Sequence, residues 1–230
     1  MKNSLRFRGN LLILGTAFLW SFVGIITKAV SYHAMTVTGI ASIMAVLVLL
    51  VYNRRHSWHI TPLAVGTGVV IAVMHICFMV ANKHTTVTNA IVLQYSSPIF
   101  VVLYYRIFQK RKLKKQQLLA VGACFIAMVL FFSGELTARN MFGNALAVLS
   151  GICFAGEFYL CAKPENDAAL AHVLSHLICI VVCLGYTGLF VKQEYDWGQT
   201  GLVLLSGVLC IGMAAVTYTI GIRMTTALNA

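Results

Sequence analysis

One acidic residue stands inside a long apolar stretch of this sequence. Glu157 is the single carboxylate within the apolar run 141–161, and a charge at such a place is costly in a membrane interior, which favours a functional role. Helical spacing places further residues on the face of Glu157, namely Ser150, Phe154 and Cys161. A second face carries small residues suited to helix packing, namely Gly143, Ala147, Gly151 and Ala155. We therefore predict that Glu157 faces a cavity and takes up and releases a proton, and the alternative is a neutral carboxyl group that makes one interhelical hydrogen bond.

Polar and polarisable side chains recur at helical spacing on two other apolar runs. In 63–82, His75, Met79 and Asn82 would share one face. In 10–30, Trp20 lies near the middle, away from the membrane interface where tryptophan is usual. We predict that these four residues line a binding site, with packing as the alternative for Trp20. Lys28, near the outer end of its run, is expected to extend toward the interface.

The run 87–108 carries a proline at its middle. Pro98 removes a backbone hydrogen bond and bends the helix, which a bilayer tolerates only where protein or a cavity satisfies the freed carbonyl groups. Gln94, Tyr95 and Ser97 precede this bend. We predict that these three residues and Pro98 belong to the binding site.

Four potential metal ligands lie on one run, namely His172, His176, Cys179 and Cys183. As a helix this stretch is about 16 Å long, whereas zinc requires each ligand at about 2.0–2.3 Å. One straight helix cannot surround an ion with all four, although a half-site shared with another helix stays open. We predict no metal and no cofactor, and no phosphate-binding loop or nucleophile elbow occurs in the sequence.

The composition excludes an ordinary soluble domain. Of the 230 residues, 60% are hydrophobic and 10% are charged, whereas charged residues make up roughly a quarter of soluble domains. The net charge of +11 could suggest nucleic acid as a partner, but the basic residues lie in short gaps between apolar runs, which favours cytoplasmic loops of a membrane protein. The seven cysteines all lie in apolar runs, which argues against a disulfide framework.

The apolar runs predict an all-α polytopic membrane protein of about eight transmembrane helices. Each run is close to the ~20 residues needed to cross a bilayer. The predicted spans are 10–30, 34–52, 63–82, 87–108, 116–133, 141–161, 170–191 and 200–222.

Basic residues set the predicted orientation. With the amino terminus in the cytoplasm, the cytoplasmic side would carry Lys2, Arg6, Arg8, Arg54, Arg55, Arg106, Lys110, Arg111, Lys112, Lys114, Lys115, Lys163 and Arg223. The other side would carry Lys28, Lys83, Arg139 and Lys192. This bias predicts a cytoplasmic amino terminus.

Two parts of the chain resemble each other. Gly9-Asn10 recurs as Gly143-Asn144 at an offset of 134 residues, and Thr85-Thr86 with Asn89-Ala90 recurs as Thr225-Thr226 with Asn229-Ala230 at an offset of 140. Five predicted helices separate the two starts, so the second copy would be inverted. We predict a first five-helix repeat over 9–133 and a second, incomplete repeat of three helices over 141–230. The repeat pairs Tyr218 with Phe78, which makes Tyr218 a further site candidate, and it implies that about 45 further residues with two helices would complete the second copy.

The sequence resembles a known family at several of these positions. Gly9-Asn10, then Ala17-Phe-Leu-Trp-Ser21 with Lys28, and then Ala90 with the Pro98 helix are similar to the EamA-type permeases of the drug/metabolite transporter superfamily. The resemblance covers essentially the whole chain. It implies two inverted five-helix repeats and movement of small metabolites, often outward, although family members usually have ten helices.

We therefore expect a permease of small metabolites or amino-acid-like solutes in the cell (inner or plasma) membrane, which works by alternating access. Export and proton coupling through Glu157 are further hypotheses. The expected partners are a small-molecule solute and the lipid bilayer, without nucleic acid, and a homodimer is left open. The alternatives are an intramembrane enzyme that uses His75, Glu157 or a cysteine, and a non-transporting scaffold or truncated product.

Overall fold

The computed structural model describes residues 2–110, 115–132 and 140–225, and every regular element within them is helical. In chain order these elements are α1 (Lys2–Ala29), α2 (Ala34–Tyr52), α3 (Pro62–His84), α4 (Val87–Gln94), α5 (Ser97–Phe108), α6 (Lys115–Phe132), α7 (Met141–Cys161), α8 (Ala168–Cys179), η2 (Ile180–Leu184), α9 (Gly185–Phe190), α10 (Trp197–Ser206), η3 (Gly207–Met213) and α11 (Ala214–Met224). The segments η2 and η3 are π-helical turns that join α8 to α9 and α10 to α11 without a break in the helix.

Seven of the eight predicted spans are helices long and apolar enough to cross a membrane. Within the described residues these are Leu5–Ala29, Ala34–Tyr52, Pro62–His84, Val87–Phe108, Met141–Cys161, Ala168–Phe190 and Trp197–Met224. The remaining predicted span, 116–133, corresponds to α6, whose apolar stretch over Lys115–Met128 is shorter. The prediction of an all-helical polytopic membrane protein is confirmed.

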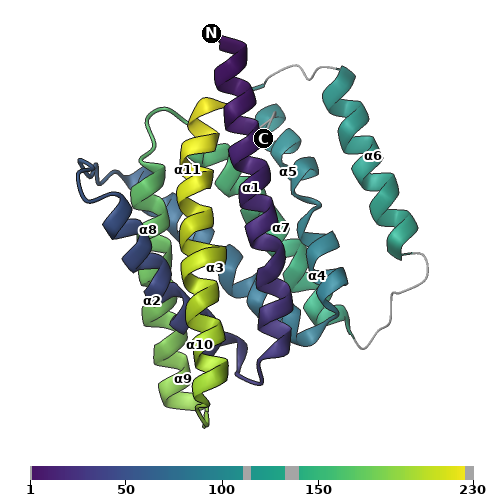
Figure 1. Ribbon diagram of the computed structural model, residues 1–230. Coiled ribbons are helices and arrows are strands. Elements are labelled where there is room, and N and C mark those ends of the chain that lie inside the picture. Colours follow the sequence, from purple (N-terminus) through teal and green to yellow (C-terminus); the bar gives the residue numbers. More distant parts are fainter. Residues whose placement is uncertain (1, 111–114, 133–139, 226–230) are drawn as a thin grey trace.

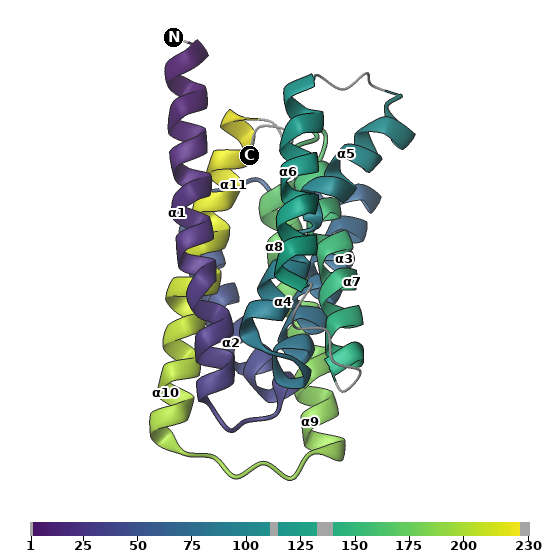
Figure 2. The same cartoon turned by 90° about the vertical axis from the view of Figure 1, so that its right-hand side faces the viewer.

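The helices form a bundle whose centre is built by α3, α7 and α8. Helix α3 packs against both α7 and α8, α1 runs along α11, and α2 packs against α8 and η3 (Figure 1). Helix α6 stands at the edge of the bundle beside α5. The start of α1 and the ends of α5 and α11 lie at one end, and the α9–α10 connection lies at the other (Figure 2). We call the first of these the N-terminal end.

Side chains that cap helix ends explain where several helices begin. The hydroxyl group of Thr61 accepts a hydrogen bond from Ala64 N at 3.1 Å, and Pro62 follows in the first turn of α3. Thr86 caps α4 in the same way through Asn89 N at 3.1 Å. Each cap satisfies a backbone donor that has no partner inside its helix.

Lys28 does not simply extend to the interface as predicted. Its ammonium group donates to the carbonyl groups of Asn82 and Thr85, both at 3.1 Å, at the end of α3.

Asp167 caps α8 and also receives hydrogen bonds from the α2–α3 connection. Its Oδ1 accepts from Leu170 N at 3.1 Å, and its Oδ2 accepts from His56 Nε2 at 2.9 Å and from His59 N at 3.2 Å. Partial burial acts to raise the pKa of Asp167, but these hydrogen bonds outweigh burial, so the pKa lies below its usual value. The carboxylate thus holds two connections together at the N-terminal end.

The predicted break at Pro98 is present and divides one membrane span into α4 and α5. Helix α4 ends at Gln94, and α5 begins at Ser97 with Pro98 in its first turn. The carbonyl group of Leu93 accepts from Ser96 N at 3.1 Å and from Ser96 Oγ at 2.6 Å. A carbonyl group freed at the break therefore finds a partner within the protein, as a membrane interior requires.

Candidate functional site: a central cavity and a buried carboxylate

A small cavity of about 50 Å³ lies halfway along the bundle. It is lined by Trp20, Ser21, Val23, Met74, His75, Phe78, Ile91, Gln94, Tyr95, Phe154 and Ile211. These residues come from α1, α3, α4 with the α4–α5 break, α7 and η3, and most of them lie near the middle of their membrane spans. The cavity therefore lies where the five spans come together.

The break at Pro98 and the packing of α7 position one wall of this cavity. Gly151 of α7 lies directly against the break, because a Cβ atom at this position would be 2.9 Å from the Gln94 carbonyl oxygen and 3.1 Å from that of Leu93. Glycine thus allows the irregular backbone of the break to approach α7 closely. Gln94 and Tyr95, at the end of α4, are thereby held at the cavity.

Aromatic rings form another part of the wall. The ring of Trp20 meets that of Phe154 at a centroid distance of 5.3 Å and that of Tyr218 at 5.6 Å. Tyr218 is fully buried behind Trp20, where its ring also contacts those of Phe158 and His172. The Trp20–Phe154, Phe158–Tyr218 and His172–Tyr218 contacts are edge-to-face, an arrangement that aromatic pairs prefer.

Four of the predicted site residues line the cavity, namely Trp20, His75, Gln94 and Tyr95. Met79 and Asn82 lie deeper in the packing of α3: Met79 accepts a hydrogen bond from the Thr27 hydroxyl group, and Asn82 donates to the Phe78 carbonyl group. Ser97 is buried at the start of α5, and Pro98 is exposed on the outside of the bundle. The structure does not bring these four residues to the cavity wall, and their assignment to the site stays a prediction.

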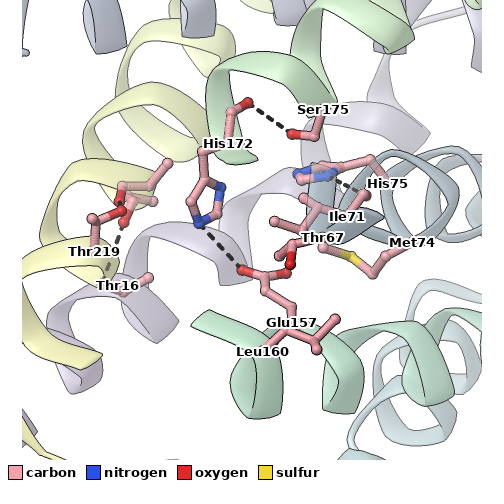
Figure 3. Close-up of polar contacts among 12 residues, drawn as sticks. Thr16, Thr67, Ile71, Met74, His75, Glu157, Leu160, His172, Ser175 and Thr219 are labelled. Carbon is pink, nitrogen blue, oxygen red and sulfur yellow. Dashed lines mark hydrogen bonds and ion pairs between the residues drawn. The ribbon is translucent and has the colours of Figure 1, made fainter. Parts of the chain in front are cut away.

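Glu157 also lies outside the cavity wall. It is wholly buried and sits four residues before the end of α7, nearer the N-terminal end than the cavity. Its Oε1 is 3.7 Å from His172 Nε2 (Figure 3). This separation exceeds that of a hydrogen bond, and neither carboxylate oxygen has a hydrogen-bond partner among the described residues. Phe154, one turn earlier on the same face, is the residue of α7 that reaches the cavity.

Sequence reasoning missed the aliphatic part of the wall and the partner of Glu157. Met74, Ile91 and Ile211 are ordinary apolar residues, and nothing in their type distinguishes them from core residues. His172 was examined only as a metal ligand, whereas a buried histidine and a buried acid on consecutive spans could have been paired. Within the described residues, no three His, Cys, Asp or Glu side chains are placed to hold a metal ion.

A model of the EamA-like transporter family matches residues 7–133, which is more than half of the chain. The chain belongs to the EamA-like transporter family. It is therefore a membrane transporter of the drug/metabolite transporter superfamily and a multi-pass membrane protein.

The comparison with solved structures agrees on the fold. Twelve chains match significantly. One of them, titled "Crystal structure of protein", superposes with a TM-score of 0.75 over 98% of this chain and 82% of its own length, at 16% sequence identity. At this identity the likeness shows a shared fold and no more. No curated protein matches the chain significantly.

Proposed function

We propose that this EamA-family transporter exports small metabolites or amino-acid-like solutes by alternating access around the central cavity, coupled to protons through Glu157. The observation that carries the proposal is the position of the cavity, halfway along the bundle between α1, α3, the α4–α5 break, α7 and η3. Solute sites of secondary transporters lie near the midplane, between repeats and beside broken helices.

Contacts between positions related by the repeat offsets support a two-fold arrangement. Trp20 and Phe154 are 134 residues apart and their rings are in contact. Ser42 and His176 are also 134 residues apart, and Ser42 Oγ lies 3.3 Å from His176 Nδ1. Two positions that a two-fold axis exchanges can touch only near that axis. Since Trp20 and Phe154 both line the cavity, the proposed axis passes beside it.

A reciprocal pair of glycine contacts supports the same arrangement. A Cβ atom on Gly9 would lie 2.8 Å from Met224 Cβ, and one on Gly143 would lie 2.8 Å from the carbonyl carbon of His84. Gly143 follows Gly9 by 134 residues, and Met224 follows His84 by 140, the two offsets of the repeat. We therefore propose that the first helices of the two copies make equivalent contacts with the third helix of the other copy.

The cavity lining suggests the class of solute. No Lys, Arg, Asp or Glu is among the lining residues of the described chain, and hydrogen bonding is available from His75, Gln94 and Ser21. A small solute with an apolar or aromatic part and a few polar groups fits such a wall. The cavity volume of about 50 Å³ is far below the roughly 300–1,000 Å³ of usual ligand pockets. Solute binding therefore requires the walls to separate, as alternating access does.

The proposed location is the cell membrane, inner or plasma, with the amino terminus in the cytoplasm. Arg106 in the last turn of α5 and Arg223 in the last turn of α11 lie at the N-terminal end, together with the start of α1. Basic residues are enriched on the cytoplasmic side of membrane proteins.

An intramembrane enzyme is the competing proposal, and its nucleophile–base pair would be Ser42 and His176. Both side chains are almost completely buried, and neither lines the cavity. A substrate has no access to them, so the geometry favours transport.

Transport by the full chain in sealed proteoliposomes tests the proposal. Vesicles preloaded with unlabelled amino acids are mixed with a panel of ¹⁴C-labelled amino acids, with and without a pH gradient. The chain should accelerate uptake of at least one apolar or aromatic amino acid over protein-free vesicles, and the gradient should drive accumulation. Glu157→Gln should keep exchange and lose the gradient effect, because Gln is nearly isosteric and cannot ionise. Glu165→Gln, an exposed acid beyond the end of α7, is the matched control and should behave as the unmodified chain.

Three outcomes would contradict parts of the proposal. A chemically altered product would favour the enzyme. Equal gradient effects in the unmodified chain and Glu157→Gln would remove Glu157 from coupling. Lack of movement of every amino acid would contradict the proposed solute class.

A further inference from the structure

Buried titratable side chains connect Glu157 to the cavity. Glu157 Oε1 lies 3.7 Å from His172 Nε2, and the ring of His176 meets the ring of His75 at a centroid distance of 4.9 Å. His172 and His176 are four residues apart on α8, so they are neighbours on one helical face. His75 lines the cavity. The four side chains therefore lead from α7 through α8 to α3, and Figure 3 shows three of them, Glu157, His172 and His75.

Most polar atoms along this row lack hydrogen-bond partners. Among the described residues this holds for both carboxylate oxygens of Glu157, both ring nitrogens of His172 and Nε2 of His176. A buried polar atom without a partner costs about 1–3 kcal/mol, and such groups are normally satisfied by buried water. A role in core packing alone does not account for five buried polar atoms without partners in one row.

The row has a direction within the bundle. Glu157 is four residues from the end of α7 and His172 is four residues from the start of α8, so both lie one turn from the N-terminal end. His176 is one turn deeper, and His75 lies near the middle of α3. Beyond Glu157, toward the N-terminal end, the Asn166 side chain donates to the Thr67 hydroxyl group at 3.0 Å. Polar groups therefore run from the end of the bundle to the cavity.

Within the part of the chain that the structure describes, no Lys, Arg, Asp or Glu lines the cavity itself. Ser21 and Tyr95, which are exposed at its rim, lie at the middle of their spans on the outer surface of the bundle. Neither of these two residues leads toward an end of the bundle, whereas the row from Glu157 to His75 does.

Other titratable groups face α8 from the helices around it. Helix α7 contributes Cys161 besides Glu157, and α11 contributes Tyr218, whose ring meets that of His172 at 5.5 Å, and Arg223 near its end. Helix α2 presents the Ser42 hydroxyl group to His176 Nδ1, and Cys183 lies in η2. Proton relays inside membranes are built from carboxyl and imidazole side chains, so among these groups we consider only Glu157 and the histidines.

We propose that Glu157, His172, His176 and His75 form a proton route between the N-terminal end of the bundle and the cavity. This inference rests on the proposed proton coupling. The Glu157 carboxyl group gives its proton to His172 Nε2, so that an O–H bond breaks and an N–H bond forms. The imidazolium releases its other proton from Nδ1 toward His176, with buried water bridging the gap, and His176 passes a proton to His75.

The hydrogen bond of His75 determines which of its nitrogens receives the proton. Its Nδ1 lies 3.0 Å from the Ile71 carbonyl oxygen, which can only accept, so Nδ1 carries a hydrogen and donates. Nε2 is then the acceptor, and proton arrival converts His75 to a cation at the cavity wall. The other imidazoles are left as the opposite tautomer and return by ring rotation or by a reverse transfer.

Trp20 can report the arrival of the proton, because it shares the cavity wall with His75 and a protonated imidazole quenches indole fluorescence. Trp58→Phe and Trp197→Phe leave Trp20 as the sole tryptophan of the full chain, and Trp197 is 91% exposed. The chain is reconstituted in lipid nanodiscs, and a laser pulse releases protons from 2-nitrobenzaldehyde. The time course of Trp20 quenching is then measured without any solute.

The route predicts different effects for different variants. His75→Gln should abolish the quenching. His176→Gln and Glu157→Gln should keep its final amplitude and slow it by about 10²-fold, the usual contribution of a positioned proton-transfer group. His84→Gln changes an exposed histidine of α3 and should quench as fast as the unmodified chain. The melting temperature of each variant confirms folding, and His172→Gln replaces any variant that fails to fold.

Two results would overturn the route: quenching in His176→Gln and Glu157→Gln as fast as in the unmodified chain, or no quenching in the unmodified chain. The readout is independent of transport. If quenching is slowed in His176→Gln and Glu157→Gln but transport does not respond to pH, the route stands and the proposed coupling is contradicted. If a pH gradient drives transport but quenching is not slowed in these variants, the coupling stands and the route is contradicted.

Discussion

Gly151→Ala should destabilise the protein, although alanine is the better helix former. An added Cβ atom would lie 2.9 Å from the Gln94 carbonyl oxygen, 3.0 Å from Ser96 Oγ and 3.1 Å from the Leu93 carbonyl oxygen. Two of these atoms are backbone atoms of the α4–α5 break and cannot move independently. Overpacking of this kind costs about 1–3 kcal/mol, against a gain of about 1 kcal/mol in helix propensity.

Gly66→Ala supplies the matched control, because Gly66 is exposed on α3 and a Cβ atom there would meet nothing within 4 Å. It gains the same propensity without the clash, so the two variants should differ by the packing term of about 1–3 kcal/mol. At roughly 2–4 °C per kcal/mol for a chain of this size, Gly151→Ala should melt about 2–12 °C below Gly66→Ala. A thiol-reactive fluorophore detects unfolding in detergent as the buried Cys77, Cys161 and Cys179 become exposed. Equal melting temperatures would show that α7 does not press on the break.

Three further outcomes are expected. Gly9→Ala and Gly143→Ala should each lower the melting temperature relative to Gly66→Ala, by similar amounts if their contacts are equivalent; an effect in one alone would contradict the proposed symmetry. Asp167 has a lower pKa in the folded chain than in the unfolded chain. Its contribution to the stability of the fold is therefore present above about pH 4 and is lost as the pH falls through the lowered folded pKa. Between pH 6 and pH 3, the melting temperature of Asp167→Asn should fall less than that of the unmodified chain. Lys28→Met should cost about 1.5–3 kcal/mol, because hydrogen bonds from a charged donor to the end of α3 are lost; an unchanged denaturation midpoint would show that the ammonium group is solvated instead.

Membrane spans and the helix break follow from local properties, and the sequence was sufficient for both. An apolar run of about 20 residues must form its backbone hydrogen bonds internally in a bilayer, so length and composition predict a helix. Proline lacks the N–H group that continues a helix, so Pro98 predicts the end of α4 within a few residues. Helix α6 shows the limit of this reasoning. The predicted span 116–133 and the apolar stretch Lys115–Met128 differ in length by a single turn, yet the shorter stretch is not long enough to count as a membrane span.

Helical periodicity predicted which residues share a face, and the tertiary structure decided what each face meets. Ser150, Phe154 and Glu157 share a face of α7 as predicted, but only Phe154 reaches the cavity, because α8 and α11 cover the turn that carries Glu157. His75 and Asn82 were assigned to one site, yet Asn82 is held by the backbone of α3. The pairing of Glu157 with His172 joins two consecutive helices, and that of His176 with His75 joins helices far apart in the sequence. Spacing along one helix carries no information about the rotation and depth of its neighbours, so these contacts are decided only when the helices pack together.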